Sequence, residues 1–216
     1  MSDKFINDLW SVLKFLDEIS HLSYYSSHIV RESGLALIIF KCMSDIFTQE
    51  QLELALVAKE QEENRQQYFE RNVWYIPKGA RWDELLSNDT TQSLGENISQ
   101  AFRLLEEQNN DINGMLIYNF EENVFDKRAL LGLYSKLSYV VDFNEQKDYR
   151  DGYIYLFEFI LSKSYLKKGV HLYSETTKKL LEYLISKLKF RSIERYSTNE
   201  QLWHSTNRHT SSIQNT

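Results

Sequence analysis

The scarcity of turn residues constrains the fold of this chain most. Only one proline and seven glycines occur in 216 residues. A fold of many short strands needs turn residues at most connections, whereas long helices joined by polar loops do not. We therefore predict a mainly α-helical protein with at most a short β element. Because 42% of the residues are hydrophobic and 14% are aromatic, the chain can bury a sizeable core.

Apolar residues at helical spacing predict where the helices lie. They occur near the start of the chain, in the run LALIIFKCMSDIF, in the aromatic stretch GYIYLFEFIL and near the C-terminus. The aromatic stretch also alternates as a strand would, but its length and low glycine content favour a helix. Residues that suit helix N-caps predict four helix starts, at Thr48 (with Gln51), Ser93 (with Glu96), Asp126 and Ser174.

The segment 72–82, NVWYIPKGARW, concentrates aromatic residues and contains the proline of the chain. We expect a short extended stretch that ends at Pro77. Trp74 and Trp82 are candidates for contact with DNA or a protein partner. Core packing is the favoured alternative, because tryptophan is usually mostly buried.

Two basic residues of the same segment are better surface candidates. Arg81 suits a phosphate or a carboxylate, because a guanidinium group is rarely buried without a partner. Lys78, at the turn, provides a second candidate contact to phosphate.

Charge divides the chain into an acidic body and a basic C-terminal segment. Residues 1–162 hold 15 Lys and Arg against 27 Asp and Glu, and residues 163–195 hold 9 against 3. A protein that binds nucleic acid without the help of other subunits is usually basic throughout. In this chain, only the basic segment has a charge that favours contact with DNA. Its candidate contacts are Lys167, Lys168, Lys178 and Lys179.

The same lysines are also compatible with the solvated face of an amphipathic helix. We expect that helix to leave part of its leucine face uncovered, so that a protein partner or self-association buries it.

Familiar catalytic motifs are absent from the sequence. There is no GxG loop, no GxSxG elbow and no HExxH pair, so the residues nominate no catalytic or metal site. The single cysteine, Cys42, excludes an internal disulfide and is interpreted as a small buried residue. The start of the chain lacks the pattern of a signal peptide, and the longest apolar run is too short to span a bilayer. These features predict a cytoplasmic location.

Four segments, in order, resemble the N-terminal part of the modification (methyltransferase) subunit of type I restriction–modification systems. They are LALIIFKCMSDIF (35–47), NVWYIPKGARW (72–82), FEFIL (157–161) and KKGVHLYSETTKKLLEYLI (167–185). The resemblance implies a helical domain that helps to hold modification subunits and a specificity subunit around DNA. It also implies three parts: a helical domain over 1–165, a basic helix over 166–195 that leads toward a methyltransferase domain, and a polar, flexible tail over 196–216.

The resemblance places one wall of the S-adenosylmethionine pocket in the fourth segment. Tyr173 and Ser174 match the aromatic and hydroxyl positions of that wall, but Glu175 replaces the family's proline. The adenine-N6 chemistry of the family also needs an Asn-Pro-Pro-aromatic motif, which a chain with one proline cannot contain. We therefore expect no cofactor and no methyl transfer by this chain alone.

These observations lead to three hypotheses about function. The leading one is a non-catalytic assembly domain that binds specificity and modification subunits and supports DNA. The second is a regulatory or anti-restriction decoy that competes with the true modification subunit. The third is a fragment that retains weak S-adenosylmethionine binding. Whether the chain is part of a longer subunit or a stand-alone relative stays open, although its polar ending favours a natural terminus.

Overall fold

The regular structure of the described residues is helical, which confirms the predicted fold class. The computed structural model describes residues 3–22, 27–57, 64–86, 93–121, 124–139, 149–163 and 173–189. No strand occurs within these ranges. The expected tail at 196–216 lies outside them, as do Lys167 and Lys168.

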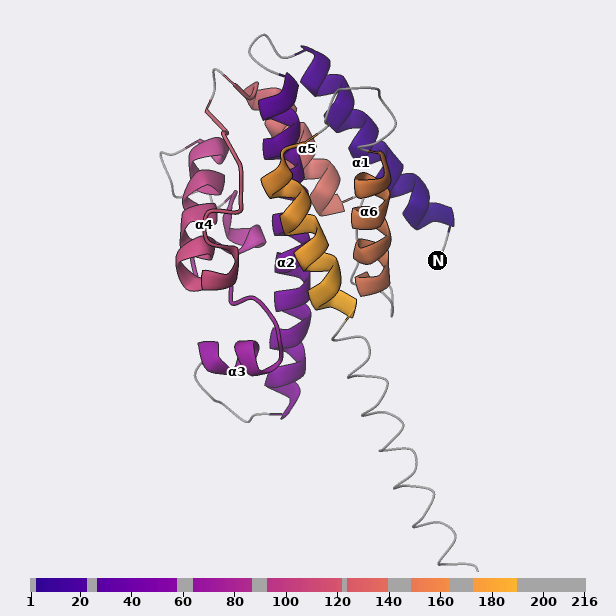
Figure 1. The fold of residues 1–216 in the computed structure, drawn as a ribbon. Helices are drawn as coiled ribbons and strands as arrows, with labels where there is room; N and C mark the ends of the chain where they lie inside the picture. The colour runs from indigo at the N-terminus through magenta and orange to yellow at the C-terminus, as the bar shows by residue number, and fades with distance from the viewer. Residues whose placement is uncertain are drawn as a thin grey trace, which may run out of the picture.

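The described residues form six α-helices, two short 3-10 helices and a further helix at residues 175–189, which has no label. Figure 1 shows how they are arranged. The labelled elements are α1 (Asp3–Leu22), α2 (Ser27–Val57), α3 (Arg65–Glu70), η1 (Trp82–Glu84), α4 (Leu94–Gln108), η2 (Asn110–Ile112), α5 (Lys127–Tyr139) and α6 (Tyr149–Lys163).

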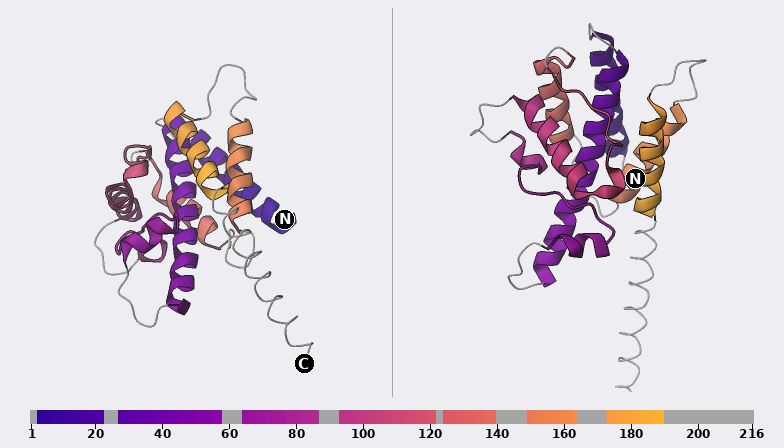
Figure 2. Two further views of the ribbon diagram at one scale, coloured as in Figure 1. Left: turned by 60° about the horizontal axis from the view of Figure 1, so that its bottom comes forward. Right: turned by 60° about the vertical axis from the view of Figure 1, so that its left-hand side comes forward.

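Helix α2 forms the centre of the molecule. Its residues 35–47 are all buried, because this run is apolar on nearly every side and other helices surround it. Helices α1 and α5 pack against it, and α4 packs against α5. Figures 1 and 2 show α6 and the helix at 175–189 lying side by side, with the 175–189 helix next to α2. The resulting core is continuous across the domain.

Buried ionic groups tie α2 to its neighbours. Lys41 and Asp45 form an ion pair within α2, and the Tyr153 hydroxyl of α6 donates to Asp45. One turn further on, Glu50 is fully buried and pairs with Arg71 at 2.7 Å. A carboxylate that is shielded from solvent needs such partners, because burying an unpaired charge costs several kcal/mol of folding free energy, on the order given by its lost hydration. The Tyr153 contact therefore helps to set the position of α6 on α2, and the Arg71 pair does the same for the end of α3.

Most of the predicted helix starts are confirmed. Ser93 and Glu96 form the reciprocal capping box of α4. The Asp126 carboxylate accepts the backbone N–H groups of Arg128 and Ala129 at the start of α5. Ser174 Oγ accepts the Thr177 N–H at 3.1 Å, which caps the helix at 175–189. These caps work locally, so a short sequence pattern is enough to find them.

One local prediction differs from the structure. Thr48 and Gln51 do not begin a helix, because α2 continues through them to Val57. Inside a continuous helix the backbone already satisfies the N–H groups that a capping box would serve.

The stretch 73–77, predicted to be a short extended segment, forms neither a helix nor a strand. Its Tyr75 backbone pairs with a side chain and not with a neighbouring strand.

Candidate binding surfaces

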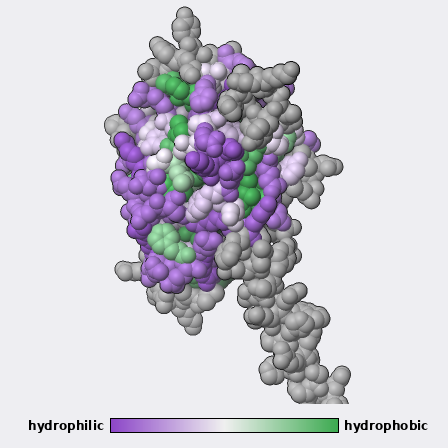
Figure 3. Space-filling view, viewed as in Figure 1, coloured by the Kyte–Doolittle hydropathy of each residue, from purple (hydrophilic) through white to green (hydrophobic). Residues whose placement is uncertain are grey.

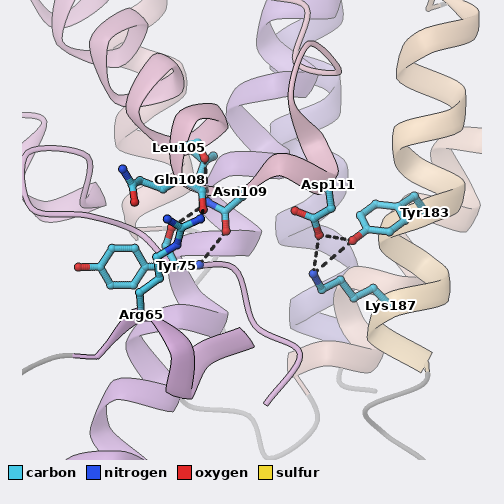
Figure 4. Close-up of polar contacts among 8 residues, drawn as sticks. All are labelled: Arg65, Tyr75, Leu105, Gln108, Asn109, Asp111, Tyr183 and Lys187. Atoms are coloured by element: carbon cyan, nitrogen blue, oxygen red, sulfur yellow. Dashed lines mark hydrogen bonds and ion pairs between the residues drawn. The ribbon is translucent and has the colours of Figure 1, made fainter. Parts of the chain in front are cut away.

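The segment 72–82 is held in place by one buried amide side chain. Asn109, between α4 and η2, is fully buried. Its Oδ1 accepts the Tyr75 N–H and its Nδ2 donates to the Tyr75 carbonyl, both at 2.9 Å (Figure 4). The same Nδ2 lies 2.7 Å from the Leu105 carbonyl. The side chain thus replaces a strand partner for this irregular stretch.

Both tryptophans of the segment lie in the core. Trp82 stacks on Tyr134 with ring centroids 4.8 Å apart, and its Nε1 donates to Ser138 Oγ at 2.8 Å. The Tyr134 hydroxyl donates back to the Trp82 carbonyl at 2.9 Å. Trp74 is 1% exposed. In this structure neither indole ring is available to stack on a nucleic-acid base or to insert into a pocket of a protein partner.

The two basic residues of the segment differ in exposure. Lys78 is exposed at the turn that follows Pro77. Arg81 is half-buried, and its guanidinium lies 5.4 Å from the centre of the Phe47 ring. Lys78 is therefore the more accessible of the two to a phosphate, whereas Arg81 also packs on an aromatic ring.

The N-terminal end of the helix at 175–189 meets a buried carboxylate of α2. Glu32 is 1% exposed and accepts both the Ser174 N–H and the Thr177 hydroxyl. His28, one turn earlier, lies 3.5 Å from the same carboxylate. A carboxylate is favoured at a helix N-terminus, where N–H groups lack intrahelical partners. This contact joins residues about 140 positions apart in the chain.

The predicted cofactor residues use their polar groups at this same helix start. The Tyr173 hydroxyl donates to the Ile160 carbonyl at 3.3 Å, and Ser174 serves as the cap. Both hydroxyls are therefore engaged within the domain, and a cofactor-binding role of Tyr173 and Ser174 stays a prediction.

Near its other end, the same helix is tied to the segment 72–82 and to η2. Lys187 Nζ lies 2.8 Å from Asp111 Oδ2 (Figure 4). It also lies 4.4 Å from the centre of the Trp74 ring. The Tyr183 hydroxyl donates to Asp111 as well. Burial acts to raise the pKa of Asp111, but the hydrogen bonds from Lys187 and Tyr183 outweigh it and lower that pKa. Burial and the neighbouring Asp111 raise the pKa of Tyr183 well above its usual value.

The leucine face of this helix is fully used, which corrects one expectation. Leu180, Leu181, Leu184 and Leu188 are all buried, at most 3% exposed. The prediction that part of this face stays uncovered is wrong, because these four leucines lie in the core of the domain itself. Figure 3 shows mostly hydrophilic residues on the face that carries this helix, with hydrophobic residues in a few patches.

Two of the lysines predicted to contact DNA, Lys178 and Lys179, lie on the described part of the basic helix. Lys179 is exposed, and Lys178 is half-buried with Glu175 at 3.8 Å. The apolar and basic faces of the helix are therefore separate, as expected for an amphipathic helix.

Sequence reasoning missed the residues that attach this helix. No sequence motif includes Asp111, Tyr183 or Lys187. Asn109 lies in the polar run EEQNND, which is typical of a loop. Their contacts span 34 to 76 positions of the chain. A local sequence pattern cannot identify hydrogen-bonding residues that lie so far apart in the chain.

Reactive and metal-binding sites depend on how the cysteine and the possible metal ligands are arranged. Cys42 is fully buried, and burial raises the pKa of its thiol, which disfavours the reactive thiolate. Over the described ranges, no three His, Cys, Asp or Glu side chains gather as metal ligands would. No helix within those ranges combines the length and the apolar character needed to cross a membrane.

Comparison with known proteins identifies the family. The model of the HsdM N-terminal domain matches residues 7–138, from α1 to the end of α5. No curated protein matches the chain. The matched range covers more than half of the 216 residues and includes both the buried run of α2 and the segment 72–82. The chain therefore belongs to the HsdM N-terminal domain family, that of the modification subunit of type I restriction–modification systems.

Proposed function

We propose that this protein acts in the cytoplasm as a non-catalytic assembly domain of a type I restriction–modification complex. It binds the specificity and modification subunits, and it supports DNA as a secondary role. Family membership supports the setting. The observation that carries the role is the attachment of the helix at 175–189 near both ends, through Glu32 and Asp111. A helix held in this way presents its outer face in a fixed position.

The basic side chains of that helix supply the proposed DNA contact. Lys178 and Lys179 project from a helix whose leucine face is already buried. Contacts of this kind are to phosphates and carry no sequence information. Few of them are available and the body is acidic, so we expect weak DNA binding that decreases steeply as salt rises.

A binding experiment with purified subunits tests the proposal. The protein is immobilised and offered the specificity and modification subunits of its type I system, separately and together. Retention of at least one subunit at physiological salt is the expected result. If neither subunit is retained at micromolar concentration, the proposed assembly role is wrong.

The acidic body supports a second candidate, a decoy that competes with the true modification subunit. Residues 1–162 hold 27 Asp and Glu against 15 Lys and Arg. A decoy inhibits the complete enzyme when added in excess and binds no DNA at any salt concentration. An assembly domain joins the complex without inhibiting it, so titration into a methylation assay separates the two.

The third candidate, a fragment that binds S-adenosylmethionine, has the least support. The engagement of Tyr173 and Ser174 within the domain argues against it. We expect isothermal calorimetry to show no cofactor affinity in the micromolar to millimolar range. Measurable one-to-one binding would restore this candidate.

A further inference from the structure

The last two described helices, α6 and the helix at 175–189, contact each other and follow one another in the chain. They lie side by side (Figures 1 and 2). The Tyr173 hydroxyl donates to the Ile160 carbonyl at 3.3 Å, and Lys189 pairs with Glu158 at 2.7 Å. We call α6 and the helix at 175–189 the C-terminal pair.

Two buried carboxylates of α2 receive groups from α6. The Tyr153 hydroxyl donates to Asp45, which is 7% exposed. One turn earlier in α6, the Arg150 guanidinium lies 3.7 Å from the carboxylate of Glu50, which is fully buried. Because Arg150 is buried too, these contacts lie inside the interface between α6 and α2 and are shielded from solvent.

Two further carboxylates receive groups from the helix at 175–189. At its start, the Thr177 hydroxyl donates to Glu32 of α2, which is 1% exposed. Near its end, Lys187 pairs with Asp111 of η2 at 2.8 Å. In these contacts, as in those of α6, the C-terminal pair supplies the donor and the preceding elements supply the carboxylate.

The elements that precede the C-terminal pair also pack on one another. Helices α1 and α5 pack on α2, and α4 packs on α5. The family match, over residues 7–138, ends before α6 begins. We call the elements from α1 to α5 the α1–α5 unit. Since the C-terminal pair is joined to this unit only through the chain between residues 139 and 149, it can separate from α2 without unthreading the unit.

Buried carboxylates make this separation less costly than the separation of a purely apolar interface of the same size. Glu32, Asp45 and Glu50 lose their hydration when the C-terminal pair closes on α2, and they regain it when the pair opens. Buried apolar residues such as Phe157 and Leu184 favour the closed state. Proteins open in contiguous units of this kind, at free energies below that of global unfolding.

We infer that the C-terminal pair is a strap whose two helices open from α2 and close on it together, while the α1–α5 unit stays folded. The boundary between the two parts then lies between residues 139 and 149, and not at residue 165 as the family resemblance implies. The inference concerns the free protein and does not rest on the proposed function. Opening of the strap would, however, carry Lys178 and Lys179 away from the position in which they are proposed to contact DNA.

Native-state hydrogen–deuterium exchange on the full chain tests the strap, under conditions in which closing is faster than exchange. Tyr153→Phe removes from α6 the hydroxyl that donates to Asp45, and Thr177→Val removes from the other helix the hydroxyl that donates to Glu32. Each variant is expected to raise exchange roughly 2- to 10-fold in both helices of the C-terminal pair, and by the same factor in both. Either variant is sufficient if the other does not fold, which circular dichroism checks.

Tyr134→Phe is the matched control. This substitution also removes a buried tyrosine hydroxyl, which donates to the Trp82 carbonyl within the α1–α5 unit. Because the strap opens while that unit stays folded, Tyr134→Phe is expected to raise exchange in α5 and to leave exchange in the C-terminal pair unchanged.

Three results would overturn the inference. An increase confined to the helix that carries the substitution shows that the two helices open independently. Faster exchange of the C-terminal pair in Tyr134→Phe shows that the pair does not open apart from the α1–α5 unit. Unchanged exchange in the folded strap variants shows that the contacts to Asp45 and Glu32 do not hold the pair. The binding experiment with the subunits is independent of these results, so the proposed function survives each of them.

Discussion

Trp74 and Trp82 lie in the core beneath the segment 72–82, whereas Trp10 stands half exposed at the rim of a cavity. The core rings have fixed partners, such as Lys187 over Trp74 and Tyr134 against Trp82. Trp10 contacts Phe159 on one side and leaves a large part of its surface to solvent. The same residue type is therefore enclosed in the core in one region and partly open to solvent in the other.

Replacing a core indole should produce the largest effect on stability. Trp82→Ala removes the ring that stacks on Tyr134 and the hydrogen bond that Ser138 accepts from the indole. We expect the free energy of unfolding to fall by about 3–5 kcal/mol, measured by urea denaturation with circular dichroism. A loss below about 1 kcal/mol would mean that Trp82 is not a core residue.

Removal of the buried carboxylate should loosen one end of the helix at 175–189. Glu32→Ala leaves the Ser174 N–H and the Thr177 hydroxyl without their acceptor, which costs about 1–3 kcal/mol. Hydrogen–deuterium exchange should rise over residues 175–181 and stay unchanged in α4. Glu18→Ala, at an exposed carboxylate of α1, is the matched control. Unchanged exchange over 175–181 would show that Glu32 does not hold this helix.

A smaller, pH-dependent effect is expected near the other end of the helix. Asp111→Asn weakens the contacts to Lys187 and Tyr183, and Asp111 is partly exposed, so we expect a loss of about 1 kcal/mol or less at neutral pH. Because folding lowers the pKa of Asp111, its contribution is present above the usual aspartate pKa of about 3.9. It is lost as the pH falls through the lower pKa of the folded state.

Unfolding experiments on both proteins at several pH values check this sign. The stability difference between the wild-type protein and Asp111→Asn should shrink as the solution is acidified. A difference that grows toward low pH would contradict the assigned contacts.

The smallest effect is expected at the open surface. Trp10→Phe keeps an aromatic ring next to Phe159, so the free domain should change in stability by roughly 0.5 kcal/mol or less. The same substitution at Trp82 loses the hydrogen bond to Ser138 and should cost more. Equal losses at the two sites, measured by urea denaturation, would remove the distinction between the two regions.

Local patterns in the sequence predicted a good part of the fold. The scarcity of glycine and proline indicated helices, and Ser93, Asp126 and Ser174 marked three helix starts that the structure confirms. The helix start predicted at Thr48 is wrong, because a capping pattern does not reveal whether the preceding helix has ended. The alternating aromatic stretch proved helical, since its rings pack on several sides of α6.

The binding surfaces were harder to predict, because they depend on contacts between distant segments. The sequence identified Lys178 and Lys179 and the leucine face of their helix, but it did not reveal that the domain itself buries all four leucines of that face. Trp10 looked like one more apolar residue in a helical stripe. The exposure of Trp10 depends on how α6 packs beside α1. The sequence of α1 alone does not reveal that packing.

Hydroxyl-radical footprinting of the free protein, read by mass spectrometry, tests the central claim most directly. Trp10 should be oxidised rapidly because it is half-exposed, whereas Trp74 and Trp82 should be oxidised slowly because both lie in the core. Fast oxidation of Trp74 or Trp82, or slow oxidation of Trp10, would contradict the account.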